Sequence, residues 1–391
     1  MSSFADSITI DQLNEDPYPI YARLRKEEPV AWLPAINQWL VTRWDDVLTV
    51  VSRPESFTTH FPQSLVTRVC GRDNMLGSEG DAHAELRACV DADYSTETVH
   101  RFFAADVRTL AEKYADALAE GDRADLKKQY LGPIAVLSEA KVLGLDQVDP
   151  EIFLRWSHGL NTGITNFEGD PGKQRLGEET AAEITATLTP TVERLTAQPN
   201  QSTLSNLIHA GRPPGRPRGV AEVLPTLRLV MSAIEEPSVA GSYTLWGLFK
   251  DPKQFDAVRS DPGLLPQAVH EGLRWHSPVG ALMRSAPREV TLAGVTLPEG
   301  AQVAAIVASA NRDETMFHDP DRFDLYRPLQ PHVSLGYARH RCLAIDFVPE
   351  IVRISLEVLL ERFPGLRPDE ERPPRFRGWR YRGPDTLHVR W

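Results

Sequence analysis

Apolar residues recur at three- and four-residue spacing through most of the middle of the chain, from about residue 81 to residue 363. Residues at this spacing share one face of an α-helix, which they can bury against neighbouring elements. The clearest segments are Ala82–Asp91, Phe102–Leu118, Glu178–Leu195 and Leu224–Lys250. The pattern therefore predicts a mainly helical fold.

Shorter elements surround this helical part. The N-terminal region adds a helix, a strand and a second helix, over residues 19–25, 37–42 and 44–52. Pro266 suits the first turn of a helix that ends at Trp275. Strand patterns return in Glu289–Val303, which two turns interrupt, and in the alternating tail Thr386–Trp391. We predict a mainly α fold class with small β-sheets near both ends.

The composition is that of an acidic globular protein. The chain has 391 residues, of which 41% are hydrophobic, so it can bury a sizeable core and is neither disordered nor fibrous. The 43 Lys and Arg residues against 54 Asp and Glu residues give a net charge of −11, which disfavours binding to nucleic acid. No internal repeat, nucleotide-binding glycine motif or domain-splitting linker interrupts the sequence. We therefore predict one large domain over residues 1–391.

Neither a targeting sequence nor a membrane span is expected. The segment Met1–Pro19 lacks the basic and apolar regions of a signal peptide, and no run of about 20 apolar residues occurs. We expect a cytoplasmic protein that does not bind membranes. The proline- and arginine-rich segment Gly211–Gly219 is expected to form an exposed loop between two helices rather than a polyproline ligand.

Three cysteines, Cys70, Cys89 and Cys342, are too few and too far apart for a disulfide framework or a cysteine zinc site. A single cysteine is most often an inert, buried, small hydrophobic residue. Cys342 differs because the residues 339–341 before it read Arg-His-Arg, and cationic neighbours favour a thiolate. An amphipathic helix that follows would add backbone N–H groups, although Pro349 would delay or bend its start.

Two predicted helices carry charged pairs at helical spacing. Glu271 and Arg274 lie three residues apart, and His83 and Arg87 lie four apart, so each pair shares a helix face. As solvated surface pairs they would contribute a few tenths of a kcal/mol. Alternatively, a buried carboxylate could be held by guanidinium groups, and buried cationic side chains could bind the acidic groups of a ligand.

A proline interrupts the predicted helix over Leu224–Lys250. Within a helix, Pro237 would remove one N–H group and clash with the carbonyl of Ala233, at a cost of about 3 kcal/mol. We expect Pro237 to free this carbonyl and to kink a continuous helix. The alternative is that Pro237 merely marks the end of a helix.

The segment Leu335-Gly-Tyr-Ala-Arg-His-Arg-Cys-Leu-Ala344 resembles the haem-ligand loop of the cytochrome P450 monooxygenases, whose pattern is Phe-Gly-x-Gly-x-His-x-Cys-x-Gly. It matches at Gly336, His340 and Cys342. The departures from the pattern are Leu335, Ala338 and Ala344. A left-handed conformation at Ala338 would cost about 1 kcal/mol.

The resemblance implies the cytochrome P450 fold and a haem b cofactor whose iron (the metal) is bound by the Cys342 thiolate as axial ligand. It also implies that Glu271 and Arg274 pair with Arg327, in Phe323-Asp-Leu-Tyr-Arg327, and lock the loop that carries Cys342. The expected partners of the haem propionates are His83, Arg87, Arg284 and His340.

Glu236 and Pro237 stand where most of the family has an acid and a threonine. A bacterial subgroup that demethylates guaiacol-type aromatics from lignin resembles this chain in that substitution. The implied catalytic residues are therefore Glu236, which would relay protons to the haem, and Pro237, whose kink would admit water. The implied reaction is O-demethylation of a small methoxy-substituted aromatic with O2, which yields a phenol and formaldehyde. The candidate pocket walls are Ile164, Ala233, Val279, Gly280 and Tyr381.

Electrons must come from another protein because the chain has no flavin or iron–sulfur motif. The resemblance implies a [2Fe–2S]/flavin reductase that uses NADH. Although the whole chain is acidic, the Arg-His-Arg sequence before Cys342 would provide a basic surface for an acidic redox partner.

Several other functions stay open at this point. The chain could hydroxylate another small substrate, act as an O2-independent haem isomerase or dehydratase because the usual threonine is missing, or carry or sense haem without catalysis. A metal hydrolase built on His332, His340 and Cys342 is a further alternative, but its zinc-type spacing is poor and it leaves the Glu271–Arg274 pair unexplained.

Overall fold

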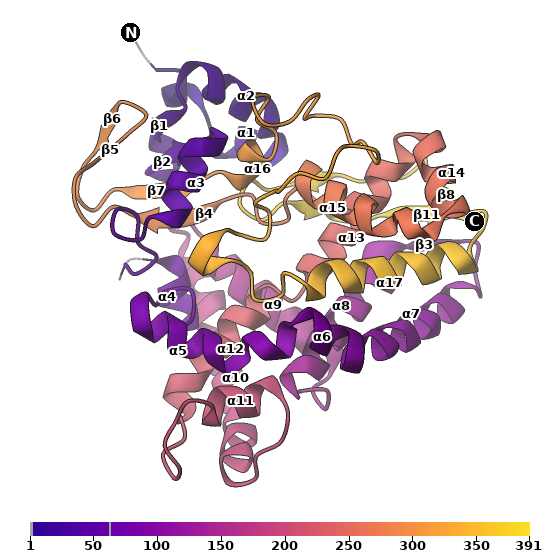
Figure 1. Cartoon of the computed structure of the whole chain (residues 1–391), viewed down its shortest axis with the longest axis horizontal. Helices are drawn as coiled ribbons and strands as arrows, with labels where there is room; N and C mark the ends of the chain where they lie inside the picture. The colour runs from indigo at the N-terminus through magenta and orange to yellow at the C-terminus, as the bar shows by residue number, and fades with distance from the viewer. Residues whose placement is uncertain (1–2, 62–63) are drawn as a thin grey trace. The chain divides into compact units, whose positions relative to one another are not determined.

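The computed structural model describes residues 3–61 and 64–391, and it is mainly helical with small β-sheets, as predicted (Figure 1). The chain forms two compact units, each assembled from separate stretches of the sequence. The first unit consists of Met1–Thr58, Ala104–Ile134 and Glu236–Trp391, and the second of Thr59–Phe103 and Ala135–Glu235. The single large domain over residues 1–391 stays a prediction.

Every strand among the described residues lies in the first unit. The largest sheet has the order β1-β2-β7-β4 and consists of β1 (Val30–Leu33), β2 (Gln38–Val41), β7 (Gln302–Ala305) and β4 (Leu282–Ser285). In it, β2 pairs with β7 in parallel, with Leu40 opposite Ala304, so two distant parts of the sequence meet there. The smaller sheets are β3-β11-β8 (Arg123–Asp125, His388–Arg390, Arg367–Pro368), β5-β6 (Val290–Leu292, Val295–Leu297) and β10-β9 (Gly383–Pro384, Phe376–Arg377).

The helices of the first unit come from all three of its stretches. They are η1 (Ala5–Ser7), α1 (Ile10–Glu15), α2 (Tyr18–Glu27), η2 (Pro34–Ile36), α3 (Trp44–Ser52), α7 (Ala104–Leu118), η5 (Lys127–Leu131), α13 (Glu236–Phe249), α14 (Pro252–Ser260), η6 (Pro262–Leu264), α15 (Leu265–Trp275), α16 (Val307–Ala310), η7 (Ala338–His340) and α17 (Phe347–Arg362). Helices α13, α15 and α17 pack against one another. A Cβ atom at Gly272 of α15 would lie 2.3 Å from Thr244 Oγ1 of α13, so glycine permits this close crossing.

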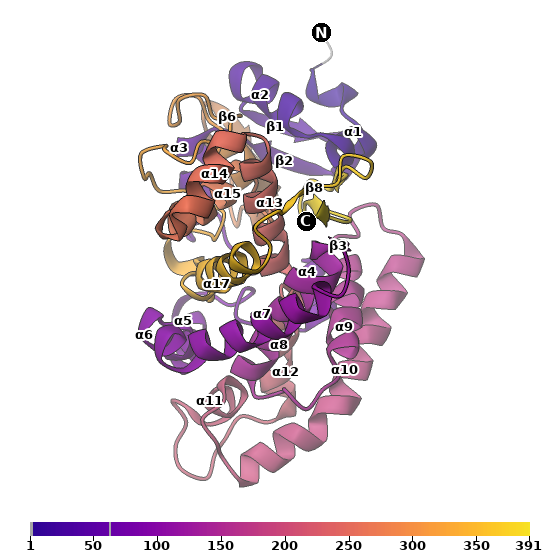
Figure 2. The ribbon, with the colours of Figure 1, turned by 90° about the vertical axis from the view of Figure 1, so that its right-hand side faces the viewer.

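The second unit is helical throughout. It contains α4 (Leu65–Cys70), α5 (Gly80–Val90), η3 (Asp91–Tyr94), α6 (Thr96–Thr98), η4 (Val99–Phe103), most of α8 (Gly132–Leu143), α9 (Pro150–Ile164), α10 (Pro171–Ala197), α11 (Thr203–His209) and α12 (Val220–Ser232). Helices α9 and α10 lie side by side (Figure 2). The segment 211–219 is the loop between α11 and α12, as predicted, and most of it is exposed.

An apolar cluster holds the large sheet of the first unit against α3. Val41 and Val303 of the sheet, and Trp44 and Val47 of α3, are all buried in it. Phe317 joins them, with its ring 5.7 Å from that of Trp44 in an edge-on arrangement. Helix α3 spans the predicted residues 44–52, and the predicted helix that ends at Trp275 and the strands within 289–303 are also confirmed.

The prediction of one continuous helix over Leu224–Lys250 is wrong. Helix α12 ends at Ser232, residues 233–235 form a turn, and α13 begins at Glu236, which is also where the chain passes between the two units. Pro237 explains the break because it can neither donate to the carbonyl of Ala233 nor avoid it in a continuous helix. As the second residue of α13 it costs little, since the first N–H groups of a helix have no acceptor within it.

No helix within residues 3–61 and 64–391 combines the length and the apolar character that a membrane crossing requires.

Candidate functional site

Cys342 lies at the end of a tightly closed loop. Its backbone N–H donates to the carbonyl of Leu335 at 2.6 Å, and the N–H of Gly336 donates to the carbonyl of Val333 at 3.0 Å. Between them, the single turn η7 brings Arg341 N within 3.2 Å of the carbonyl of Ala338. The Cys342 side chain is partly exposed, and it is not joined in a disulfide. The backbone thus holds a free, partly exposed thiol at a fixed place on the loop.

Two residues in this loop adopt the left-handed conformation. Gly336 has φ +75° and Ala338 has φ +54°. A Cβ atom at position 336 would lie 2.9 Å from the carbonyl oxygen of His340, so the loop needs glycine there. Ala338 takes the strained conformation that the sequence analysis anticipated, at a cost of about 1 kcal/mol.

The helix after Cys342 does not begin at the cysteine itself, so the predicted place of the thiolate at a helix N-terminus is wrong. A turn over residues 343–346 intervenes, and α17 begins at Phe347. The anticipated effect of Pro349 explains the delay. Pro349 is the third residue of α17, where its missing N–H has no acceptor within the helix. A helix that began directly after Cys342 would place this proline in its interior, where the bond would be lost.

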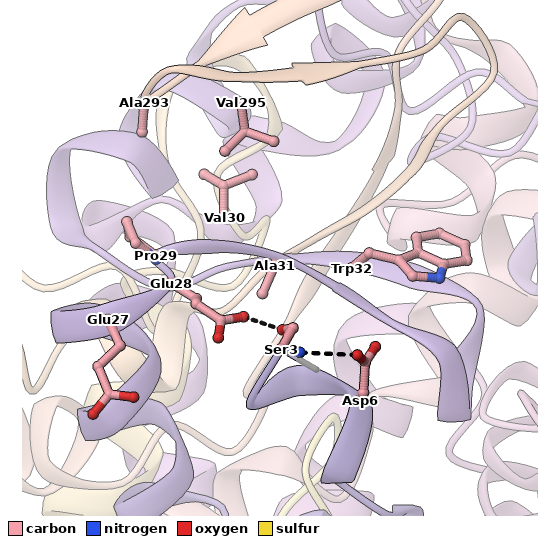
Figure 3. A pocket seen from close by; sticks show the side chains of 10 residues that line it. All are labelled: Ser3, Asp6, Glu27, Glu28, Pro29, Val30, Ala31, Trp32, Ala293 and Val295. Atoms are coloured by element: carbon pink, nitrogen blue, oxygen red, sulfur yellow. Dashed lines mark hydrogen bonds between the residues drawn. The ribbon is translucent and has the colours of Figure 1, made fainter. Parts of the chain in front are cut away.

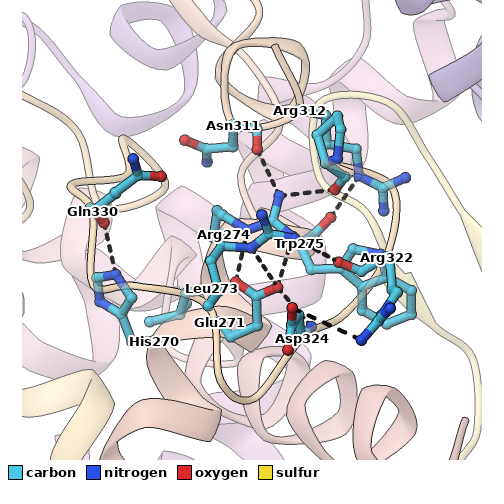
Figure 4. Close-up of polar contacts among 12 residues, drawn as sticks. His270, Glu271, Leu273, Arg274, Trp275, Asn311, Arg312, Arg322, Asp324 and Gln330 are labelled. Carbon is cyan, nitrogen blue, oxygen red and sulfur yellow. Dashed lines mark hydrogen bonds and ion pairs between the residues drawn. The ribbon is translucent and has the colours of Figure 1, made fainter. Parts of the chain in front are cut away.

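The structure brings Glu271, Arg274 and Arg327 into one buried ion cluster, of which Figure 4 shows Glu271 and Arg274. The Arg274 guanidinium donates to both carboxylate oxygens of Glu271, at 2.7 and 2.8 Å, and Arg327 Nε donates to Glu271 Oε1 at 3.1 Å. The side chain of Glu271 is 3% exposed, that of Arg274 is 1% exposed and that of Arg327 is 9% exposed. Burial lowers the pKa of Arg274, and the bonds to Glu271 oppose that shift. Removing one member of such a cluster leaves a buried charge uncompensated, which costs about 3–5 kcal/mol.

Hydrogen bonds lead from this cluster to the loop that carries Cys342. Arg274 Nη1 donates to the carbonyl of Asn311 at 2.9 Å. The Asn311 side chain donates to Ser334 Oγ at 2.7 Å and accepts from Val333 N at 2.9 Å, just before the loop. Asn311 and Ser334 were not among the predicted site residues. The available signal was an amide side chain directly after the apolar segment Val307–Ala310, which is buried.

The predicted propionate partners lie on three different elements. His83 and Arg87 are one turn apart on α5 in the second unit, both buried, and Arg87 Nε pairs with Asp91 at 2.6 Å. Arg284 is buried on β4 in the first unit. His340, partly exposed, is the last residue of η7 in the first unit. Each of these side chains has the charge or hydrogen-bonding capacity that a carboxylate ligand requires.

The first unit brings three of the five predicted pocket residues together. Val279 and Tyr381 are paired as an antiparallel bridge, and the N–H of Gly280 donates to the carbonyl of Arg380 at 2.6 Å. The other two belong to the second unit: Ile164 is the buried last residue of α9, and Ala233 follows α12 and is exposed.

Glu236 and Pro237 are the first two residues of α13. Glu236 is partly buried and Pro237 is buried. The predicted kink at Pro237 is thus a complete break between two helices, and the acidic side chain stands in the first turn of the second helix, where an acid interacts favourably with the helix dipole.

A metal hydrolase site at His332, His340 and Cys342 is ruled out as an interpretation. Among the described residues, no group of three or more His, Cys, Asp or Glu side chains is arranged to hold a metal ion. His332 accepts a hydrogen bond from Ser334 N at 3.3 Å and packs against the ring of His270, 4.6 Å away. Burial lowers its pKa to about 3, so His332 is neutral near pH 7.

A hollow of about 450 Å³ in the first unit is lined by none of the predicted site residues (Figure 3). It is lined by β1, the end of α2 and the turn between β5 and β6. Its carboxylates already have partners within the unit: Glu28 accepts from Phe4 N at 2.8 Å, and Glu27 pairs with Arg23 at 2.8 Å. This hollow is therefore not part of the candidate site.

The donor set around Cys342 fits a haem group. A single thiol held by backbone bonds, without a multidentate His, Cys or carboxylate cluster among the described residues, suits one axial bond to an iron whose other ligands come from a porphyrin. The buried Arg284, and His340, which lies two residues before Cys342, supply hydrogen-bond donors of the kind that propionates need.

Comparisons with known proteins support this reading of the site. A family model described as cytochrome P450 matches residues 249–342, a segment that ends at Cys342. The cytochrome P450 monooxygenase PikC of Streptomyces venezuelae is 29% identical, over 96% of this chain and 91% of that protein. The 6-deoxyerythronolide B hydroxylase of Saccharopolyspora erythraea is 28% identical, over 91% of each chain.

Solved structures agree over nearly the whole length. The ligand-free structure of cytochrome P450 TbtJ1 has a TM-score of 0.85 and 28% identity, over 97% of this chain and 98% of that chain. The structure of P450BioI in complex with hexadec-9Z-enoic acid ligated acyl carrier protein has a TM-score of 0.88 over 97% and 99%. Its identity of 24% makes it evidence for the fold alone.

Proposed function

Since the chain belongs to the cytochrome P450 family of haem-thiolate monooxygenases, with their fold and their haem b cofactor, we propose that it O-demethylates a small methoxy-substituted aromatic compound. The observation that carries the proposal is the pair Glu236–Pro237 at the start of α13, in place of the acid and threonine usual in the family. The guaiacol-type demethylases resemble the chain in this pair.

Cys342 would provide the axial thiolate, and His83, Arg87, Arg284 and His340 would hold the propionates. When bound, the haem supplies the activation of O2, which electron donation from the thiolate favours. The task of the Cys342 loop is to hold its sulfur in one place, and the backbone bonds of Gly336 and Cys342 serve that task.

Glu236 would handle protons for the reaction. Its carboxylate is partly buried in the first turn of α13, and the turn over residues 233–235 precedes it. A carboxylate that is only partly buried can exchange protons with water on its exposed side. Glu236 would therefore take protons from water and pass them toward the substrate pocket.

By the resemblance, the walls of that pocket would include Val279, Gly280 and Tyr381 of the first unit. Their mostly apolar character suits a small aromatic ring.

Insertion of one oxygen atom into a C–H bond of the methoxy group gives a hemiacetal, which collapses to a phenol and formaldehyde. The balance is one methoxyaromatic, one O2, one NADH and one proton, which become the phenol, formaldehyde, NAD+ and water. The electrons would come through a [2Fe–2S]/flavin reductase.

The test is NADH-dependent release of formaldehyde by the haem-loaded protein with its reductase, over a panel of guaiacol, alkylguaiacols and methoxybenzoates. We expect equal amounts of phenol and formaldehyde, only when O2 is present, and only for compounds that shift the iron spin state on binding. Cys342→Ala should abolish both products, whereas Cys89→Ala, which changes a buried cysteine on α5, should not. Product formation by Cys342→Ala, or without O2, would refute the proposal.

A second candidate is hydroxylation of another small substrate, which the hydroxylase among the chain's relatives favours. A hydroxylase would give a product that gains one oxygen atom and keeps all its carbon atoms, with no formaldehyde. Mass spectrometry of the products therefore separates the two reactions.

A further inference from the structure

Asn311 stands between the buried ion cluster Glu271–Arg274–Arg327 and the loop that carries Cys342. We propose that Asn311 is a positioning residue that transmits the rigidity of the cluster to this loop. The proposal rests on the haem-thiolate assignment above but adds a residue and a task to it. Asn311 directly follows α16, and its side chain is completely buried.

The main chain of Asn311 is fixed by the cluster. The Arg274 guanidinium is held by both oxygens of Glu271, which leaves Nη1 to donate to the carbonyls of Asn311 and Pro320, each at 2.9 Å. Figure 4 shows Arg274 between Glu271 and Asn311. On the other side, Asn311 N donates to the carbonyl of Val307 at 2.9 Å. The backbone at position 311 is therefore tied both to α15 and to α16.

The side chain of Asn311 carries the connection onward. Its amide nitrogen donates to Ser277 Oγ at 2.9 Å and to Ser334 Oγ at 2.7 Å, and its oxygen accepts from Val333 N at 2.9 Å. Both amide hydrogens and the carbonyl oxygen are thus used. A primary amide offers two donors and an acceptor in one plane, which neither a carboxylate nor an apolar side chain of this size can replace.

The residues that Asn311 holds are those on which the Cys342 loop closes. Ser334 Oγ also donates to the carbonyl of Leu273 on α15, at 2.6 Å. The carbonyl of Val333 accepts from Gly336 N, and that of Leu335, the next residue after Ser334, accepts from Cys342 N. A series of hydrogen bonds therefore leads from Glu271 through Arg274 and Asn311 to residues 333 and 334. The backbone continues it to Leu335, whose carbonyl accepts from the amide of Cys342.

These hydrogen bonds fix the position of the Cys342 sulfur before any ligand binds. Residues that bond to a metal ligand, and not to the metal, commonly fix the orientation of that ligand, and a site is precise only when its supporting residues are themselves held. Without the Asn311 side chain, residues 333–342 keep their own internal bonds and the bonds of Ser334 to Leu273 and Ser277, but they lose the connection through Asn311 to Arg274. We expect the loop to open more often and the sulfur to leave the iron more readily.

The test compares Asn311→Ala with Asn166→Ala. Asn166 is a matched control because it is buried in the second unit and its amide also bonds at both ends, to the backbone of Asp170 at 2.7 and 2.8 Å. The first readout is the red-shifted absorption band of the reduced, CO-bound haem protein, which reports the thiolate. The second is hydrogen exchange of the amides in residues 333–342, measured by mass spectrometry.

We expect Asn311→Ala to lose the thiolate band at least fivefold faster in mild urea, and to exchange the Gly336 and Cys342 amides about tenfold faster. Asn166→Ala should show neither effect, even at an equal loss of global stability. If Asn311→Ala does not fold, Ser277→Ala, which removes one of the three side-chain bonds and keeps the bond to Val333, should show smaller changes of the same sign.

Unchanged band stability and exchange in Asn311→Ala, or equal changes in Asn166→Ala, would overturn the proposal. If the wild-type protein never shows the thiolate band, the haem-thiolate assignment fails instead. The exchange rates still decide whether Asn311 holds the loop, because they do not depend on haem.

Discussion

At the scale of single residues, the Cys342 loop carries a strain that one substitution can remove. Ala338 has φ +54°, a conformation that costs an alanine about 1 kcal/mol and a glycine almost nothing. We expect Ala338→Gly to raise the free energy of unfolding by up to about 1 kcal/mol, less the extra flexibility that glycine gives the unfolded chain. Urea unfolding of the haem-loaded protein, followed by circular dichroism, measures the change.

Ala344→Gly is the matched control, because position 344 also departs from the glycine of the family pattern but has no positive φ. Its carbonyl accepts from Val348 N at 2.9 Å in an ordinary turn. Glycine there should lower stability by about 0.5–1 kcal/mol. Equal effects of the two substitutions would mean that backbone strain is not what distinguishes position 338.

The residues that sequence reasoning found and those it missed differ in the range of their contacts. Glu271 and Arg274 are one turn apart on a helix, so their spacing alone places them side by side. Asn311 acts through Ser277, Val333 and Ser334, and only the folded chain brings these residues to it. No local spacing encodes that meeting, so the relay to the Cys342 loop could not be predicted.

At the scale of elements, helical periodicity predicted the buried faces of the helices better than the residues at which the helices begin and end. The apolar spacing of Leu224–Lys250 continues through residues 233–235 because both α12 and α13 bury a face, although the two helices are separate. Periodicity reports which side of a segment is buried, not whether its hydrogen bonds are continuous. Pro237 was the signal for the break. A proline in the first turn of a new helix has a lower steric cost than a proline inside one continuous helix.

A buried acid between two elements of the second unit gives a pH-dependent prediction. Glu139 of α8 accepts a hydrogen bond from the hydroxyl of Tyr94 in η3 at 2.5 Å, and burial raises the pKa of Glu139 to about 7. The folded state therefore binds this proton more tightly than the unfolded state, whose pKa is near 4.5. The stabilisation is full below about pH 4.5, falls as the pH rises to about 7, and then stays constant.

The loss amounts to about 3 kcal/mol across this window, as an order of magnitude. Glu139→Gln, which can still accept from Tyr94, should remove this part of the pH dependence. We expect the difference in urea midpoint between the variant and the wild type to shift in favour of the variant from pH 5 to pH 8. A difference that does not change with pH would show that Glu139 does not titrate in this window.

At the scale of the whole molecule, the sequence could predict the class of fold but not its assembly. Each unit is assembled from separate stretches, and β2 pairs with β7 although Leu40 and Ala304 are far apart in sequence. Short strands read from alternation carry no information about their partners. The resemblance around Cys342 supplied what the physical pattern could not, namely that these elements belong to a known fold.

Charge is the property of the whole molecule that bears on its electron donor. The chain has a net charge of −11, but Arg339 and Arg341 are exposed beside Cys342. We propose that an acidic [2Fe–2S] partner docks on this basic turn. Because the chain and such a partner both carry a net negative charge, only the local positive charge of the turn can attract the partner. Arg339→Glu should slow electron transfer from such a partner about tenfold at low ionic strength, whereas Arg339→Lys should not.

The decisive comparison is with Arg216→Glu, which makes the same change in net charge in the exposed loop between α11 and α12 of the second unit. If docking depends on the local field, Arg216→Glu keeps the wild-type rate and only Arg339→Glu is slow. Near 1 M salt, where the Debye length falls to about 3 Å, all of the variants should converge on one rate. Equal slowing by both substitutions would assign the effect to net charge, and a rate independent of salt would mean that this turn does not steer the partner.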